Sequence, residues 1–225
     1  MTTLPVVHAV TTDEIIARDD FLDRAAAVMR VLGPRGAVHL RAADASARQL
    51  HRLAAALAAL QKSTGAWLVV NDRVDIALAS GARGIQLTSR SMGADDAIRA
   101  ARATATGTPR PAVGVSVHAV EDARAIAVAD GISWLVVGHV FETPSHDGVP
   151  GRGAALLRDV RAAVTLPVIA IGGVRPSHLS GLRADGAYGV AVIRGIWRAD
   201  DAERAAAEYL SAYDAVQDAG ANGAG

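Results

Sequence analysis

The 225 residues carry 23 basic and 23 acidic side chains, and 51% of them are hydrophobic. This balance argues against binding to nucleic acid or to an acidic membrane surface, because both select a basic excess. Cysteine is absent, which excludes disulfides, thiolate nucleophiles and cysteine-ligated metals. The single lysine, Lys62, lies in a helical segment, so neither Schiff-base chemistry nor a P-loop is expected.

No apolar run reaches the roughly 18 residues that a membrane span needs, and the first residues lack a signal-peptide pattern. We therefore expect a cytoplasmic protein without a membrane partner.

Short apolar runs alternate with alanine-rich helical segments along the whole chain. The runs are nearly continuous, as is typical of parallel strands that are buried on both faces. We expect strands at 6–10, 37–40, 66–70, 84–87, 112–116, 133–137, 168–171 and 189–192. The clearest helical patterns cover 47–60, 95–105, 120–129, 155–164 and 200–213.

Eight such units with right-handed crossovers predict an α/β protein, a single (β/α)8 TIM barrel that covers residues 1–217. A doubly wound open sheet is the alternative. The last stretch, 218–225, is rich in Gly, Ala and Asn, and we expect it to be a disordered tail.

In a barrel, functional residues gather in the loops that follow the strands. Gly172-Gly173 follows the seventh expected strand and Arg194-Gly195 follows the eighth. Glycine lets backbone N–H groups approach an anion, so these two loops predict a phosphate site. Alternatively, the glycines only make tight turns.

His139 follows the sixth expected strand, in the run Gly138–Thr143. A histidine at the barrel rim can take and return a proton near neutral pH. Alternatively, it only hydrogen-bonds a loop. Glu142 is a second candidate acid or base, and the polar stretch 144–153 reads either as a mobile lid or as a plain surface loop.

Polar residues also follow the second, third and fifth expected strands. Asn71 and Ser116 are able to hydrogen-bond a ligand, and Arg41 shares a strand face with His39, which points it toward the barrel mouth. The alternative for Arg41 is a surface salt bridge. Asp72 is either a metal ligand or the N-cap of the next helix, and one carboxylate makes a poor magnesium site.

Four segments together resemble the thiamine phosphate synthase superfamily: 71–78, 114–118, 138–143 and 167–173. The resemblance runs from about residue 6 to residue 213, and its combination of motifs is specific. The superfamily has two main branches. Synthases join a pyrimidine diphosphate to a thiazole phosphate with magnesium, whereas TenI-type tautomerases move a proton on a carboxythiazole phosphate without metal.

The chain departs from the synthase pattern at several positions. Ala43 stands where synthases carry a lysine, Ser91 replaces the second magnesium carboxylate, and another expected lysine falls near His146. His139 stands where synthases have proline and tautomerases have histidine. The resemblance is therefore closer to the tautomerase branch, although Asp72 is a synthase feature.

The resemblance implies a thiazole tautomerase, an isomerase of thiamine biosynthesis that needs no metal or other cofactor. It would convert a 2-carboxy-4-methyl-5-ylidene thiazoline ethyl phosphate to the aromatic carboxythiazole phosphate by a proton shift through His139. The expected partners are this phosphorylated thiazole and a second copy of the chain, in a homodimer. The expected substrate-binding residues are Arg41, Asn71, Ser116, Thr143, Gly172, Gly173, Ile193, Arg194 and Gly195.

Two alternatives remain open at this point. The chain is a thiamine phosphate synthase, or it is a non-catalytic regulatory protein that binds thiazole phosphates and leaves them unchanged.

Overall fold

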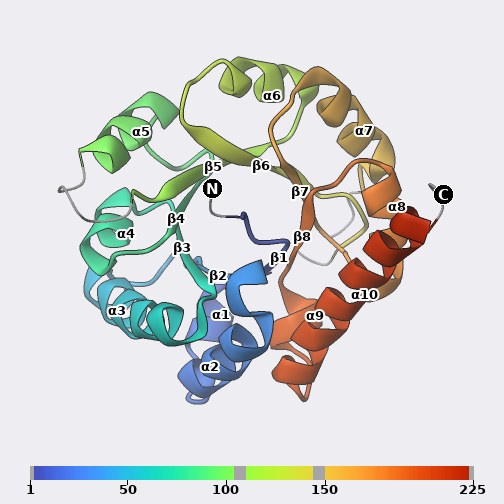
Figure 1. Cartoon of the computed structure of the whole chain (residues 1–225). Coiled ribbons are helices and arrows are strands. Elements are labelled where there is room, and N and C mark those ends of the chain that lie inside the picture. The colour runs from blue at the N-terminus through green and yellow to red at the C-terminus, as the bar shows by residue number, and fades with distance from the viewer. Residues whose placement is uncertain (1–2, 104–109, 144–149, 223–225) are drawn as a thin grey trace.

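The computed structural model describes residues 3–103, 110–143 and 150–222, with side chains up to residue 216. Eight parallel strands follow one another around a closed barrel, and β1 pairs with β8 to close it (Figure 1). The strands are β1 (Val7–Val10), β2 (Gly36–Leu40), β3 (Trp67–Asn71), β4 (Gly84–Leu87), β5 (Ala112–Val117), β6 (Ile132–Gly138), β7 (Val168–Ile171) and β8 (Gly189–Val192).

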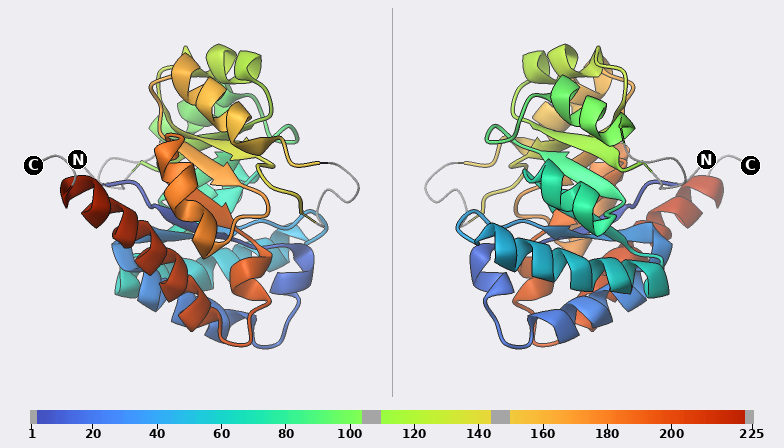
Figure 2. Two further views of the ribbon diagram at one scale, coloured as in Figure 1. Left: turned by 90° about the vertical axis from the view of Figure 1, so that its right-hand side faces the viewer. Right: turned by 90° about the vertical axis from the view of Figure 1, so that its left-hand side faces the viewer.

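Helices surround the barrel on its outside (Figures 1 and 2). They are α1 (Asp13–Ile16), α2 (Phe21–Leu32), α3 (Ala47–Thr64), α4 (Val74–Ser80), α5 (Ala94–Arg102), α6 (Val120–Ala127), α7 (Gly153–Ala163), α8 (Leu179–Ala184), α9 (Arg194–Trp197) and α10 (Ala202–Asn222). Single turns of 3₁₀ helix cover Gly33–Arg35 and Pro176–His178.

Local signals in the sequence explain where α3 begins and ends. The hydroxyl of Ser46 caps the helix by accepting a hydrogen bond of 3.2 Å from the amide of Gln49. Gly65 ends it in the left-handed conformation, with φ of 80°, a conformation that costs glycine little. Between these residues, Leu50, Leu53 and Leu57 form the buried face.

The barrel that the sequence predicts is confirmed, and the bounds of β4, β7 and β8 coincide with the expected ones. Other elements differ, and the expected helices did not include the short helices α1, α4 and α9. The amphipathic helix α2 was not among the expected helices, although Phe21, Ala25, Val28 and Leu32 form its buried face. Helix α10 continues to Asn222 and so runs through 218–222, part of the expected disordered tail.

Two hydrophobic clusters lie on opposite faces of the sheet. The larger one joins the outward-facing strand residues to the buried faces of the helices. The smaller one fills the inside of the barrel, because alternate strand residues point inward. Its buried members are Val10, Ala37, Trp67, Val69, Trp134, Val136, Ile169 and Ala191.

Two glycines make room for the Trp134 indole inside the barrel. A Cβ atom at Gly114 would overlap the Trp134 ring, and one at Gly84 would lie 3.2 Å from its Cη2 atom. Trp134 is only 1% exposed, so the ring cannot move out into solvent. The glycines on β4 and β5 therefore determine how the barrel interior is packed.

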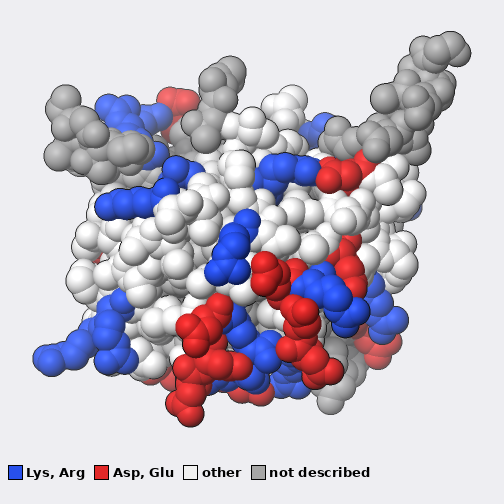
Figure 3. Space-filling view, turned by 60° about the horizontal axis from the view of Figure 1, so that its bottom comes forward, with Lys and Arg blue, Asp and Glu red and all other residues white. Residues whose placement is uncertain are grey.

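Charges of both signs alternate on the face formed by α1, α2 and α9 (Figure 3). Arg18 and Arg24 both pair with Asp20, at 2.8 and 2.7 Å, and Arg198 pairs with Glu14 at 2.8 Å. This face carries no field of a single sign. Among the described helices, none is long and apolar enough to cross a membrane.

We expect Gly114→Ala to lower the free energy of unfolding by about 1–3 kcal/mol, because the added methyl group overpacks the barrel against Trp134. Urea denaturation measures the change. Gly181→Ala in α8 is the matched control, since a Cβ there meets nothing within 4 Å. It should raise stability slightly, by up to about 1 kcal/mol. Equal stability of the two variants would contradict this account of the core.

Candidate active site at the barrel mouth

The candidate residues lie at the same end of the barrel because all strands are parallel. Arg41 follows β2, Asn71 ends β3, Ser116 lies near the end of β5 and His139 follows β6. The glycine-containing loops follow β7 and β8, and β8 returns to pair with β1. Functional sites of this fold lie at this C-terminal end.

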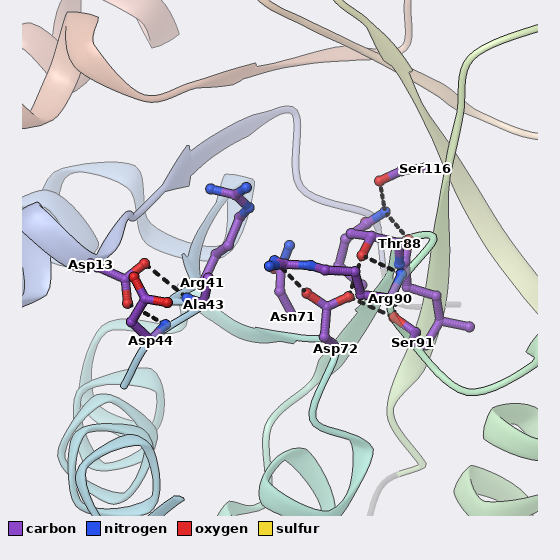
Figure 4. A network of polar contacts seen from close by, with 12 residues as sticks. Asp13, Arg41, Ala43, Asp44, Asn71, Asp72, Thr88, Arg90, Ser91 and Ser116 are labelled. Atoms are coloured by element: carbon purple, nitrogen blue, oxygen red, sulfur yellow. Dashed lines mark hydrogen bonds and ion pairs between the residues drawn. The ribbon is translucent and has the colours of Figure 1, made fainter. Parts of the chain in front are cut away.

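Arg41 is held through its backbone while its guanidinium is left available. The Thr11 hydroxyl accepts from the Arg41 amide and donates to the Arg41 carbonyl, both at 2.9 Å. The Asp13 carboxylate accepts from the amides of Ala43 and Asp44 at 2.8 Å. Although partial burial opposes it, these amides lower the pKa of Asp13. Within the described residues no side chain forms a hydrogen bond or an ion pair with the Arg41 guanidinium (Figure 4).

Asp72 is the centre of a polar cluster beside Arg41 and Asn71 (Figure 4). Its Oδ1 atom accepts from the hydroxyls of Thr88, at 2.5 Å, and Ser91, at 2.6 Å. Its Oδ2 atom lies 3.6 Å from the guanidinium of Arg90. The residue that precedes α4 is Arg73, so the reading of Asp72 as an N-cap is wrong. The side chain turns instead toward the β4 loop.

Asn71 is joined to two histidines inside the barrel. Its Oδ1 atom lies 3.2 Å from Nδ1 of His39, and His39 Nε2 lies 2.8 Å from Nδ1 of His8. His8 Nε2 lies 3.0 Å from the carbonyl oxygen of Pro5. Both imidazoles are 1% exposed. Burial lowers the pKa of His8 to about 4, and burial together with the neighbouring His8 lowers that of His39 well below its usual value.

Ser116 has a similar partner on the neighbouring strand. The Trp134 indole donates to Oε1 of Gln86 at 2.8 Å, and Nε2 of Gln86 donates to the Ser116 hydroxyl at 3.1 Å. An indole N–H only donates, so this contact fixes which way the Gln86 amide points. The Ser116 oxygen is then the acceptor, and its own proton is directed elsewhere.

His139 is a buried residue with a structural contact. Its side chain is 7% exposed, and its Nε2 atom lies 3.1 Å from the carbonyl oxygen of Pro150. A carbonyl only accepts, so this nitrogen carries a proton. The alternative interpretation, a rim histidine that hydrogen-bonds a loop, describes this contact.

The loops after β7 and β8 occupy the expected positions for a phosphate site. Gly172 and Gly173 have φ of 101° and 65°, and a Cβ at either position would overlap the loop after β6. These glycines are therefore required by close packing, whatever they bind. Helix α9 begins with Arg194 and Gly195, whose amides precede the first intrahelical bond. Their role in phosphate binding stays a prediction.

Several residues of this site were missed by the sequence analysis: His8, Gln86, Trp134, Thr88 and Arg90. The available signal was a polar side chain within an apolar strand run, as with His8 in 6–10 and Gln86 in 84–87. The proposed lid covers 144–153, and its residues 144–149, with His146, lie outside the described residues.

Three comparisons describe what the chain is similar to. The family model described as thiamine monophosphate synthase matches residues 7–196. A thiamine-phosphate synthase of Salinispora arenicola is 39% identical over 216 residues, which cover 94% of this chain and 99% of that protein. One of Gloeobacter violaceus is 40% identical over 173 residues, 77% of this chain, and the chain spans only 49% of that relative.

A solved structure shows the same likeness. The thiamine phosphate pyrophosphorylase from Pyrococcus furiosus superposes with a TM-score of 0.79 at 27% identity, over 94% of this chain and 96% of that one.

These comparisons overturn the expectation of a thiazole tautomerase and with it the isomerase class. Relatives that share 35–40% of their residues with the chain are named thiamine-phosphate synthase. The tautomerase interpretation depended on His139 and on three departures from the synthase pattern, at Ala43, at Ser91 and near His146. These are four positions, whereas the likeness to synthases extends over nearly the whole chain.

The two buried histidines make the folded state sensitive to acid. The unfolded chain takes up protons on histidine below about pH 6.5, whereas native His8 stays neutral down to about pH 4. The unfolded state then binds more protons, so the free energy of unfolding falls as the pH drops through this window. We expect a loss of about 3 kcal/mol from His8, measured by urea denaturation between about pH 7 and pH 4.

The variant His8→Gln should flatten this pH dependence, and His51→Gln on the exposed side of α3 should leave it unchanged. An unaltered slope in His8→Gln would show that other groups cause the acid sensitivity.

Proposed function

Because the chain belongs to the thiamine monophosphate synthase family, we propose that it is an enzyme that joins hydroxymethylpyrimidine diphosphate to thiazole phosphate. A C–N bond forms between the thiazole nitrogen and the pyrimidine methylene carbon. The C–O bond to the diphosphate breaks, and inorganic diphosphate leaves. The observation that carries the proposal is the 39% identity to a thiamine-phosphate synthase along nearly the full length of both chains.

Arg41 is the residue best placed to bind the leaving diphosphate. Its guanidinium is a fork of N–H donors that matches phosphate oxygens, and no described side chain competes for it. Negative charge grows on the diphosphate as the C–O bond breaks, so a fixed cation beside it stabilises the transition state. Arg90 brings a second guanidinium to the same side of the mouth, beside Asp72.

The family resemblance implies a magnesium ion, and the side chains here do not fit one. Asp72 is the one carboxylate in its cluster, and its oxygens already face two hydroxyls and Arg90. A guanidinium beside the carboxylate repels a divalent cation, and Mg²⁺ prefers carboxylate oxygens that it does not share with a cation. Among the described residues, no group of three or more His, Cys, Asp or Glu could hold a metal. We derive no step of the reaction through a metal.

The thiazole phosphate is assigned to the loops after β7 and β8. Gly172 and Gly173 bring backbone close to the mouth without side chains, and Ile193–Gly195 lead into α9. Backbone N–H groups at such a turn are suited to phosphate oxygens. Thr143 follows β6 at the same end of the barrel and completes the expected binding set.

The decisive experiment incubates the protein with both substrates and follows thiamine phosphate and inorganic diphosphate. It is run once with added magnesium and once with EDTA. Product in either condition supports the joining reaction, and product in EDTA indicates that guanidinium charge is sufficient. If neither condition gives product, the synthase proposal is wrong, and binding of thiazole phosphate without turnover would favour the regulatory protein.

We expect Arg41→Ala to lower kcat/KM of the joining reaction by about ten- to a hundredfold, because a charge-assisted hydrogen bond contributes about 1.5–3 kcal/mol. Steady-state kinetics with varied pyrimidine diphosphate measures the change. Arg52→Ala, which removes an exposed guanidinium from α3, is the matched control and should behave as wild type. Equal kinetics for Arg41→Ala and wild type would exclude Arg41 from the diphosphate site.

A further inference from the structure

A continuous chain of hydrogen bonds runs through the barrel interior to the mouth. It begins at the carbonyl oxygen of Pro5, passes through both rings of the pair His8 and His39, and ends at the side-chain amide of Asn71. The three contacts measure 3.0, 2.8 and 3.2 Å. The histidines are 1% exposed and Asn71 is 8% exposed. These hydrogen bonds therefore connect the buried interior of the barrel to Asn71, a residue of the candidate site.

The first member of the chain determines the direction of every later hydrogen bond. A carbonyl only accepts, so Nε2 of His8 must carry a proton and donate it to Pro5. In a neutral imidazole the other nitrogen accepts, so Nδ1 of His8 receives a hydrogen bond from Nε2 of His39. Nδ1 of His39 is then an acceptor as well. Its partner must be a donor, and the only donor on the side chain of Asn71 is its NH₂ group.

Burial favours the neutral form of both rings, whatever the direction of the hydrogen bonds between them. Burial lowers the pKa of His8 to about 4 and that of His39 well below its usual value. No carboxylate of the described residues contacts either ring, and the flanking groups are the indole of Trp134 and apolar strand residues. A cation in this position would have no counter-ion.

We propose that His8 and His39 are positioning residues, which hold the NH₂ group of Asn71 toward the core and its carbonyl oxygen toward the barrel mouth. The atom placed 3.2 Å from His39 Nδ1 is Asn71 Oδ1, so the proposal turns the amide group by 180° about its terminal bond. Two acceptors cannot share this contact, and Nδ2 in place of Oδ1 makes it an N–H···N hydrogen bond. Asn71 thereby presents an acceptor for a ligand N–H group. The part that concerns the ligand rests on the proposed function, whereas the orientation of the amide does not.

The neighbouring hydrogen-bond network of Trp134, Gln86 and Ser116 presents a donor to the mouth, where Asn71 presents an acceptor. Trp134 donates to Gln86, Gln86 donates to the Ser116 oxygen, and the Ser116 hydroxyl proton is left to donate. Asn71 and Gln86 are register partners on β3 and β4, so these two side chains lie on neighbouring strands of the mouth. The Asn71 carbonyl oxygen as acceptor and the Ser116 hydroxyl as donor together suit the edge of a heterocycle that has an N–H donor beside an acceptor atom.

Nitrogen NMR of the histidine-labelled protein tests the orientation without any assay of activity. At neutral pH, we expect His8 and His39 both as neutral rings protonated on Nε2 alone. The two signals are assigned with the variants His8→Gln and His39→Gln. A proton on Nδ1 of either ring, as the other tautomer or as imidazolium, would overturn the proposal.

The variant Asn71→Asp supplies a second spectrum, in which we expect Nδ1 of His39 to be protonated. A carboxylate only accepts, so it should draw a proton onto Nδ1 of His39. The replacement is nearly isosteric, which favours a folded variant, and a melting curve checks this. An unchanged His39 spectrum would mean that Asn71 does not take part in the chain, and the proposal would be wrong.

Kinetics test the ligand part separately. His39→Leu removes the acceptor for the Asn71 NH₂ group and should raise KM for the pyrimidine diphosphate about three- to tenfold, with kcat changed less. His39→Gln retains a donor and an acceptor and should restore most of the loss. Equal KM values in His39→Leu and wild type would contradict the role of the histidines in binding. An inactive wild type would instead contradict the proposed function, and the NMR spectra would still decide the orientation.

Discussion

Polar atoms that are sealed inside the barrel must hydrogen-bond to one another, and this requirement links the core to the site. His8 and His39 are 1% exposed and Gln86 is 2% exposed. An unpartnered buried donor or acceptor costs about 1–3 kcal/mol, so each partner has to be in place. A slip of one residue between strands would turn these side chains outward and break every contact. The register of β1 to β5 therefore fixes the positions of Asn71 and Ser116 before any ligand binds.

Positive charge at the mouth comes from guanidinium groups, since the chain's single lysine, Lys62, lies on the outer helix α3. The two candidate arginines differ in how readily they could bind an anion. The guanidinium of Arg41 makes no hydrogen bond or ion pair with a described residue, whereas Arg90 is paired weakly with Asp72 at 3.6 Å. Arg41 is able to bind an anion without losing a hydrogen bond or an ion pair, whereas Arg90 would have to weaken its contact with Asp72. For this reason Arg41 is the first candidate in the proposed reaction.

The barrel was predictable because buried parallel strands appear as continuous apolar runs, and the inward direction of Arg41 follows from its alternation with His39. The pairing of His8 with His39 was not predictable in the same way, because it depends on the register between β1 and β2. Helix α2 was equally predictable, since Phe21, Val28 and Leu32 lie at helical spacing on its buried face. The role of Asp72 was misread as a cap because its partners, Thr88 and Ser91, follow a different strand.

The contacts of His139 were not predictable from its position after the sixth strand. Its Nε2–H group is directed to the Pro150 carbonyl, and its Cβ atom occupies the space that a side chain at Gly172 would need. The residue at 139 thus joins the loops after β6 and β7. The chemistry of the reaction depends more on the charge that faces the substrate. A leaving diphosphate needs cations, and the mouth supplies them on Arg41 and Arg90. The tautomerase substrate is also an anion, with a carboxylate and a phosphate, so the arginines fit either reaction, and the names of the relatives favour the joining reaction.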